Sequence, residues 1–289
     1  MKRLTNDFET DIVKASQSVL LEVMTLLGAY RPHLYLVGGW APYFLLKKYQ
    51  EPKDNFQHVG SIDIDLAIDF SRVSDKGYQK IINLLEERGY QEKQSKGGQV
   101  VPFAFERKTN GNVVELDFLA GEYGGTTKVH RHQRIQTDFL ARKARGVDIV
   151  SDHYFEYELK GTLPNRAKNT VKIKVADVVA ILTMKGITLA ARYKEKDAYD
   201  IYAVVAHFKN GPISIVREIE SFLNNKLIRE GFKNIKEKFS SSDSVGCVWA
   251  AEFMAGGNED LKSRLQNEVF ITMKKFFNGI DKKPLIFIN

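Results

Sequence analysis

The chain has 289 residues, which is enough for one large domain or two smaller ones with hydrophobic cores of their own. Its single cysteine excludes an internal disulfide framework, and no apolar run approaches the ~18 residues that a membrane span needs. We therefore expect a soluble protein of the reducing cytoplasm. The formal net charge of +7 favours polyanionic partners such as nucleoside triphosphates or RNA.

The first predicted elements are a long helix and a short buried strand. Apolar residues recur at helical spacing over residues 7–30, and residues 34–37 form an apolar run. The run ends at Gly38 and Gly39, and a second helix is predicted after them. Pro42 lies near the start of this helix, where a missing amide hydrogen costs little.

A strand with strict alternation is predicted over residues 62–70. Its apolar side chains share one face, while Asp63 and Asp65 lie side by side on the other face. Two neighbouring carboxylates repel each other unless a cation lies between them, so this arrangement suits Mg²⁺. Gly38 and Gly39 let the backbone approach phosphate groups at the start of the following helix. Residues 34–70 therefore predict a triphosphate site beside a metal site.

The next predicted elements are a helix over residues 76–88 and an antiparallel hairpin. The hairpin strands cover residues 100–107 and 113–119, and the Asn110-Gly111 turn between them is a strong hairpin signal. In the second strand, Glu115 and Asp117 share one face.

The segment from residue 123 to residue 146 is basic and contains His130 and His132. We interpret the two histidines as exposed residues of a solvated segment rather than as metal ligands. Short strands are then predicted at residues 148–150, 155–159 and 171–173.

From residue 175 onward the apolar spacing is helical, with a break predicted near Gly186. We therefore expect an α+β fold. Residues 1–174 would form a catalytic domain with a mixed β-sheet flanked by helices, and residues 175–289 would form a helical domain that contributes to the nucleotide and acceptor cleft.

A second group of charged residues lies in the helical half: Lys185, Arg192, Lys196, Asp197 and Asp200. On a helix, Asp197 and Asp200 share a face, with Lys196 alongside. Taken alone, this block is typical of a solvated helix whose ion pairs are worth a few tenths of a kcal/mol each.

The order of strand, Gly-Gly, helix and Asp-x-Asp resembles the nucleotidyltransferase superfamily with the polymerase-beta-like fold. The gap between Gly39 and Asp63 is longer than is usual in that family. The sequence Gly-Gly-Trp-Ala at residues 38–41 is also similar to lincosamide and aminoglycoside nucleotidyltransferases. The block from Lys185 to Asp200 resembles the AbiEii-type and MenT-type toxins of toxin–antitoxin and phage-exclusion systems.

This resemblance implies a role for each group of residues. The metal ligands, for Mg²⁺ or Mn²⁺, would be Asp63, Asp65 and Asp117, with Glu115 as the alternative third ligand. The residues that bind the nucleoside triphosphate would be Gly38, Gly39, Ser61, Lys185, Arg192 and Lys196. Near the acceptor, Asp197 and Asp200 would have a supporting or proton-handling role.

We therefore expect an enzyme that transfers a nucleoside monophosphate from a triphosphate to an acceptor, either RNA such as tRNA or a protein. It would be the toxin of a toxin–antitoxin or phage-defence system, with a cognate antitoxin as partner and no membrane partner. One alternative is an antibiotic nucleotidyltransferase. Another is a catalytically inactive nucleotide-binding regulator, although three retained carboxylates argue against it.

Overall fold

The computed structural model describes residues 4–69, 73, 80–122, 132–192 and 194–281. The chain divides into two compact units. The first comprises Met1–Phe8, Pro42–Val59 and Asp177–Asn289, and the second comprises Glu9–Ala41 and Gly60–Ala176. Each unit has a buried apolar core of its own.

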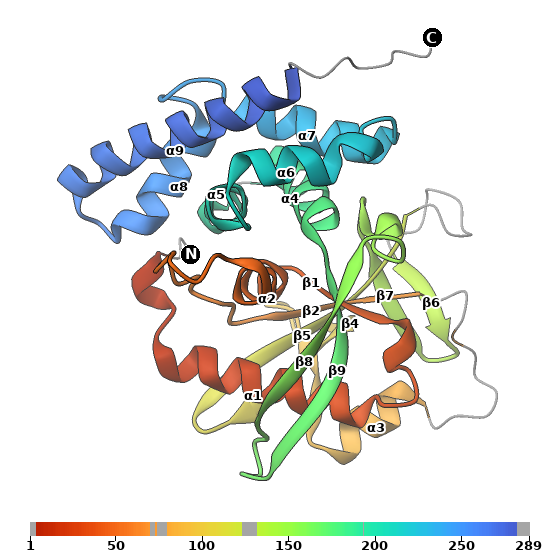
Figure 1. Cartoon of the computed structure of the whole chain (residues 1–289). Coiled ribbons are helices and arrows are strands. Elements are labelled where there is room, and N and C mark those ends of the chain that lie inside the picture. Colours follow the sequence, from red (N-terminus) through yellow and green to blue (C-terminus); the bar gives the residue numbers. More distant parts are fainter. Residues whose placement is uncertain (1–3, 70–72, 74–79, 123–131, 193, 282–289) are drawn as a thin grey trace. The chain divides into compact units, whose positions relative to one another are not determined.

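The second unit is built on a mixed β-sheet (Figure 1). The described strands are β1 (Leu34–Val37), β2 (Ile64–Ile68), β3 (Tyr90–Gln94), β4 (Val100–Thr109), β5 (Asn112–Ala120), β6 (His132–Gln136), β7 (Phe139–Lys143), β8 (Tyr154–Thr162) and β9 (Lys168–Ala176). The order of the main strands across the sheet is β3-β4-β5-β2-β1-β9-β8, and a β6–β7 pair joins it at β5. β2 pairs with β5, and β1 with β9, in parallel.

Helices α1 (Thr10–Leu26) and α3 (Ile81–Glu87) pack on this sheet. The buried face of α1 carries apolar side chains at helical spacing, which explains why the helix forms here. A polar contact also fastens α1 to two strands. The Glu22 carboxylate accepts hydrogen bonds from Arg107 Nε and from the Tyr90 hydroxyl, both at 3.0 Å.

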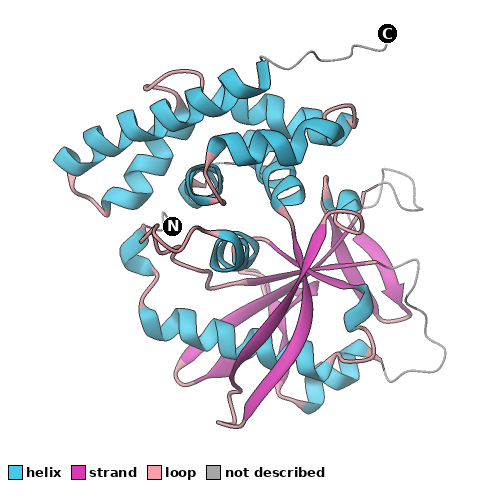
Figure 2. Ribbon diagram, in the orientation of Figure 1, coloured by secondary structure: helices cyan, strands magenta, loops and turns pink. Residues whose placement is uncertain are grey.

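The first unit is almost entirely helical (Figure 2). α2 (Trp40–Tyr49) begins in the second unit and continues into the first. The other helices are α4 (Val178–Ala191), α5 (Glu195–His207), α6 (Pro212–Ile219), α7 (Lys226–Lys238), α8 (Val245–Ala255) and α9 (Glu259–Asp281). None of the described helices combines the length and apolar character needed to cross a membrane.

A close helix crossing explains why the break predicted near Gly186 is wrong. A Cβ atom at Gly186 would lie 2.2 Å from the carbonyl oxygen of Gly231, so this glycine lets α4 and α7 pack with their backbones in contact. The helix therefore runs through Gly186. It ends at Ala191, and the next residue, Arg192, has an extended backbone with a φ of −144°.

The α+β fold class is confirmed: helices accompany a mixed sheet in the N-terminal part, and the C-terminal region from α4 to α9 is mostly helical. The hairpin at Asn110-Gly111 is also confirmed, and both residues have the positive φ that the tight turn requires (49° and 77°). The strand predicted at residues 148–150 is wrong, because Val147–Ile149 is a 3-10 helix. The predicted division at residue 174 stays a prediction. Phe70 and residues 76–79 of the predicted helix lie outside the described residues.

Candidate active site

β1 and β2 bring Gly38 against Asp65. The two strands are antiparallel with Val37 opposite Asp65, so the turn that follows β1 lies beside this carboxylate. Gly38 has φ +65°, and a Cβ atom there would lie 1.9 Å from Asp65 Oδ2. Both the backbone conformation and the available space therefore require glycine at this position. Gly39 and Ser61, which were also predicted to bind nucleotide, are buried.

The parallel pairing of β2 with β5 places Asp65 directly beside Asp117. Burial, followed by the negative charge of Asp65, raises the pKa of Asp117 to about 6. Within the described part of the chain, Asp117 Oδ1 is buried and has no hydrogen-bond partner. The two carboxylates thus form a repulsive pair that a cation would stabilise.

Lys93 on β3 lies close to the same group of carboxylates. It forms an ion pair with Glu115. Burial acts to lower the pKa of Lys93, but the hydrogen bond and the negative charge of Glu115 outweigh this effect. The charges of Asp117 and Asp63 act in the same direction as Glu115, so the pKa of Lys93 is raised overall. Because Glu115 is already neutralised by Lys93, the geometry favours Asp117 over Glu115 as a metal ligand.

The fit of this site to a divalent cation depends on the donor chemistry. Among the described residues, no three His, Cys, Asp or Glu side chains are gathered into a ready metal centre. Asp65 and Asp117 nevertheless supply the all-oxygen donors that Mg²⁺ prefers, and one of these oxygens is buried without a partner. Asp63, just before β2, remains a predicted third ligand.

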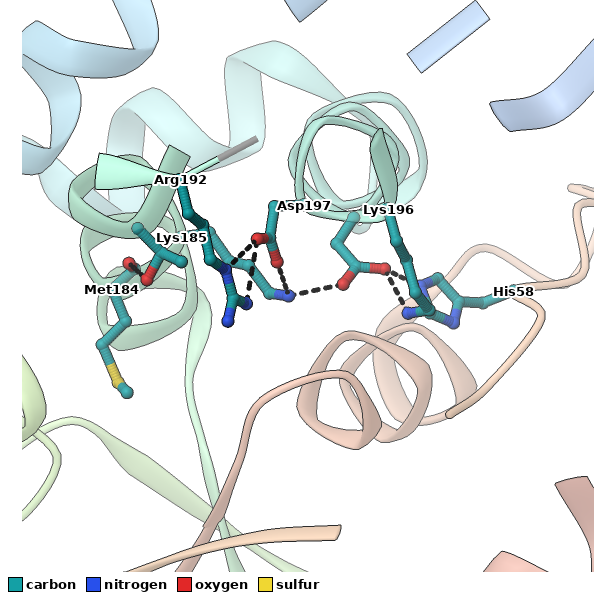
Figure 3. Close-up of polar contacts among 8 residues, drawn as sticks. His58, Met184, Lys185, Arg192, Lys196 and Asp197 are labelled. Carbon is teal, nitrogen blue, oxygen red and sulfur yellow. Dashed lines mark hydrogen bonds and ion pairs between the residues drawn. The ribbon is translucent and has the colours of Figure 1, made fainter. Parts of the chain in front are cut away.

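The second predicted group of charged residues forms a network in the first unit (Figure 3). Lys185 Nζ on α4 donates to Asp197 Oδ1 at 2.7 Å and to Asp200 Oδ2 at 2.6 Å, both on α5. Arg192 Nε donates to Asp197 Oδ2 at 3.0 Å, and Lys196 Nζ to Asp200 Oδ1 at 2.8 Å. These contacts join the charged residues of the block from Lys185 to Asp200 into one connected ion-pair network.

Apart from Arg192, the network is buried, so its interpretation as a solvated helix is wrong. Asp197 and Asp200 are 1% and 0% exposed. Burial acts to raise the pKa of Asp200, but the charges of Lys185 and Lys196 outweigh it and hold this pKa well below its usual range. Burial also acts to raise the pKa of Asp197, but the charges of Lys185 and Arg192 outweigh it and lower this pKa. Both carboxylates are therefore ionised near neutral pH, which favours a supporting role over proton handling.

Sequence reasoning missed His58, which belongs to the stretch that lengthens the gap between Gly39 and Asp63. Its Nε2 lies 3.0 Å from Asp200 Oδ1. Burial lowers the pKa of His58 to about 4, so the ring is neutral near pH 7 and its Nε2–H donates to the ionised carboxylate. The unusual gap length was the only signal in the sequence that could have drawn attention to this residue.

Two further sequence features have a structural explanation. Trp40, from the Gly-Gly-Trp-Ala run, is fully buried, and its Nε1 donates to Ser16 Oγ at 3.0 Å. His132 lies on β6 with its ring 5.2 Å from that of Phe103. His130 lies outside the described residues.

Comparison with known protein families agrees with this geometry. A family model described as the nucleotidyl transferase AbiEii toxin of type IV toxin–antitoxin systems matches residues 20–253. The match spans both the carboxylate pair and the buried ion-pair network. This chain therefore belongs to the AbiEii family of nucleotidyl transferase toxins. A search of curated proteins found no match.

Proposed function

We propose that this toxin transfers a nucleoside monophosphate from a nucleoside triphosphate to RNA, with tRNA as the favoured acceptor. The observation that supports this most directly is the close approach of Gly38, Asp65 and Asp117 on the neighbouring central strands β1, β2 and β5. The net charge of +7 favours RNA over a protein acceptor. The proposal includes a cognate antitoxin, a cytoplasmic location and a role in phage defence.

In this proposal, Asp63, Asp65 and Asp117 hold Mg²⁺ or Mn²⁺. When bound, the cation would lower the pKa of the acceptor hydroxyl and neutralise charge on the leaving pyrophosphate. The turn at Gly38 and Gly39 opens α2, and its amides bind phosphate oxygens with help from the Ser61 hydroxyl.

The charged network of the first unit supplies the remaining positive charge in this proposal. Lys185, Arg192 and Lys196 serve the nucleotide phosphates, and Asp197 and Asp200 hold these cations in position. Arg192 keeps 48% of its side chain exposed, so it is the member of the network that a ligand reaches most easily. Lys185 and Lys196 act from buried positions.

The antibiotic-modifying alternative has less support. It depended on the Gly-Gly-Trp-Ala run, but Trp40 is buried and hydrogen-bonded to Ser16, so packing in the core already explains why a tryptophan is present. Family membership also favours the toxin.

A labelling assay tests the proposal. The protein is incubated in turn with each α-labelled nucleoside triphosphate, Mg²⁺ and total bacterial RNA. We expect label in RNA of tRNA size, and a fall of about 10³-fold for Asp117→Asn, because losing a metal ligand raises the barrier by several kcal/mol. Glu115→Gln is the matched control and should stay within about tenfold of the wild type. Label in the protein fraction, or in an added lincosamide or aminoglycoside but not in RNA, would contradict the choice of acceptor.

A further inference from the structure

Three side chains form a cluster that the proposed chemistry does not use, and one of them, Arg142, lies next to Asp117. The Arg142 guanidinium lies over the Phe103 ring, 5.8 Å from its centroid. The His132 ring lies 5.2 Å from the Phe103 ring, with an angle of 34° between their planes. β6 and β7 pair His132 with Arg142, so both side chains are on the same face of the sheet. We call these three residues the Phe103–His132–Arg142 platform.

Arg142 has hydrogen-bonding capacity that the platform does not use. Its Nη2 lies 3.9 Å from Asp117 Oδ2, which is beyond hydrogen-bond distance. Its Nε is buried and, within the residues described, has no hydrogen-bond partner. The side chain is nevertheless 40% exposed. Because Nε is buried, only the terminal Nη groups of the guanidinium can donate to an anion from solvent, and their place against an aromatic ring suits them to this.

Phe103 and His132, the aromatic members of the platform, indicate which class of anionic ligand it can bind. Phe103 and His132 are both partly exposed. A phosphate alone needs no aromatic surface, whereas a nucleotide in a single strand offers both a phosphate and a base that stacks on aromatic rings or on a guanidinium plane. The platform also borders Asp117, where the proposed reaction takes place.

We propose that the Phe103–His132–Arg142 platform binds the end of a single-stranded RNA acceptor. Arg142 binds a backbone phosphate, and a base stacks on the surface formed by Phe103 and His132. This inference rests on the proposed function, because it names the part of the site that recognises the RNA. A structural role for Arg142, limited to offsetting the charge of Asp117, would not require the aromatic pair.

The test measures binding of a fluorescein-labelled single-stranded RNA oligonucleotide of mixed sequence to the full chain by fluorescence anisotropy. Arg142→Ala should weaken binding about tenfold and reduce the salt dependence by about one phosphate contact. Phe103→Leu should weaken binding about tenfold through loss of stacking, with little change in salt dependence. Arg142→Lys should keep the salt dependence, because the charge remains.

Arg145→Ala is the matched control. Arg145 is a half-exposed arginine near the end of β7, but it already forms an ion pair with Glu122 at 3.1 Å. Its loss should change RNA affinity by no more than about twofold. Thermal unfolding of each variant shows whether it has folded.

Arg142 could bind a phosphate of the RNA backbone or a phosphate of the nucleoside triphosphate. Calorimetry with a non-hydrolysable nucleoside triphosphate distinguishes these two sources, because it measures the affinity for the triphosphate alone. We expect it to be unchanged in Arg142→Ala. A larger loss of triphosphate affinity than of RNA affinity would overturn the inference, as would wild-type RNA binding by folded Arg142→Ala and Phe103→Leu. The RNA-binding assay does not depend on nucleotidyl transfer, so the two proposals can fail separately. If RNA binding depends on Arg142 but the wild type labels no RNA, the proposed function fails and the RNA-binding platform stands.

Discussion

Gly38 is the single residue where the fold and the candidate site depend most closely on each other. Gly38→Ala places a Cβ atom on the Asp65 carboxylate and adds about 1 kcal/mol of strain at a positive φ. We expect Asp65 to be displaced and transfer to fall about 100-fold, the usual consequence of misplacing a reacting group by about 1 Å. The measurement is the initial rate of label transfer.

Gly98→Ala is the control for Gly38→Ala. Gly98 also has a positive φ of +76°, but a Cβ atom there would meet no heavy atom within 4 Å. The control therefore carries the backbone strain without the collision. An equal loss of activity in the two variants would contradict the proposed importance of the contact between Gly38 and Asp65.

Lys185 gives a second prediction at this scale. It is 8% exposed and neutralises two buried carboxylates. Lys185→Ala removes this partner, and breaking a buried ion pair in this way typically costs about 3–5 kcal/mol. We expect a corresponding fall in the free energy of unfolding, measured by urea denaturation. Lys194→Ala, next to the same network but partly exposed, should cost less than about 1 kcal/mol. An equal fall in the free energy of unfolding in the two variants would indicate that the ion pairs of Lys185 contribute nothing to stability.

At the scale of elements, local patterns in the sequence predicted those parts of the fold that are determined locally. The apolar run of β1, the alternation of β2 and the Asn-Gly turn of the hairpin were all recognisable, because each depends on neighbouring residues. β6 and β7 were not predicted from the sequence. Basic residues interrupt the pattern of residues 123–146, so buried residues such as Ile135 and Phe139 could not be recognised as parts of strands.

The same reasoning explains which parts of the site could not be predicted. The carboxylates of β2 and β5 were identified because strand alternation assigns each side chain to a face. The burial of Asp197 and Asp200 depends on how α4 and α5 pack, and spacing along one helix contains no such information. The contribution of His58 depends on a contact across 142 positions of the sequence.

The segment before β2 is attached to α5, and this attachment should depend on pH. His58 bonds to Asp200, and the Val59 amide donates to the Tyr199 hydroxyl at 3.2 Å. The charges around His58 are those of Asp200, Lys185 and Lys196. Because burial lowers the pKa of His58 from 6.5 to about 4, the unfolded chain binds more protons than the folded chain between these values.

The stability contributed by neutral His58 is therefore complete above pH 6.5 and is lost as pH falls toward 4. We expect this residue alone to reduce the free energy of unfolding by about 2 kcal/mol between pH 7 and pH 5. The pKa values of Asp197 and Asp200 are also lowered, but these two groups change the free energy of unfolding only as the pH falls below about 3.8. This is outside the range from pH 7 to pH 5. Urea denaturation at both pH values compares the wild type with His58→Gln. A pH dependence of equal size in the variant would contradict this assignment.

For the whole molecule, membership of the toxin family predicts an effect on growth. Inducing the chain in a bacterial host without its antitoxin should arrest growth, and Asp63→Ala/Asp65→Ala should abolish the arrest. The double variant should still fold, because removing like charges relieves repulsion. Growth curves and circular dichroism of the purified variant provide the check. Arrest that persists in a folded double variant would indicate a toxin that acts by binding rather than by transfer.

The most direct test of nucleotidyl transfer is to follow which phosphorus of the nucleoside triphosphate reaches RNA. Two parallel reactions contain the full chain, Mg²⁺ and RNA, one with α-labelled and the other with γ-labelled triphosphate. The proposal predicts that the α label enters RNA, that the γ label leaves in pyrophosphate, and that Asp65→Asn abolishes both events. Entry of the γ label into RNA would identify a kinase, and an α label that never leaves the free nucleotide pool would contradict nucleotidyl transfer to RNA.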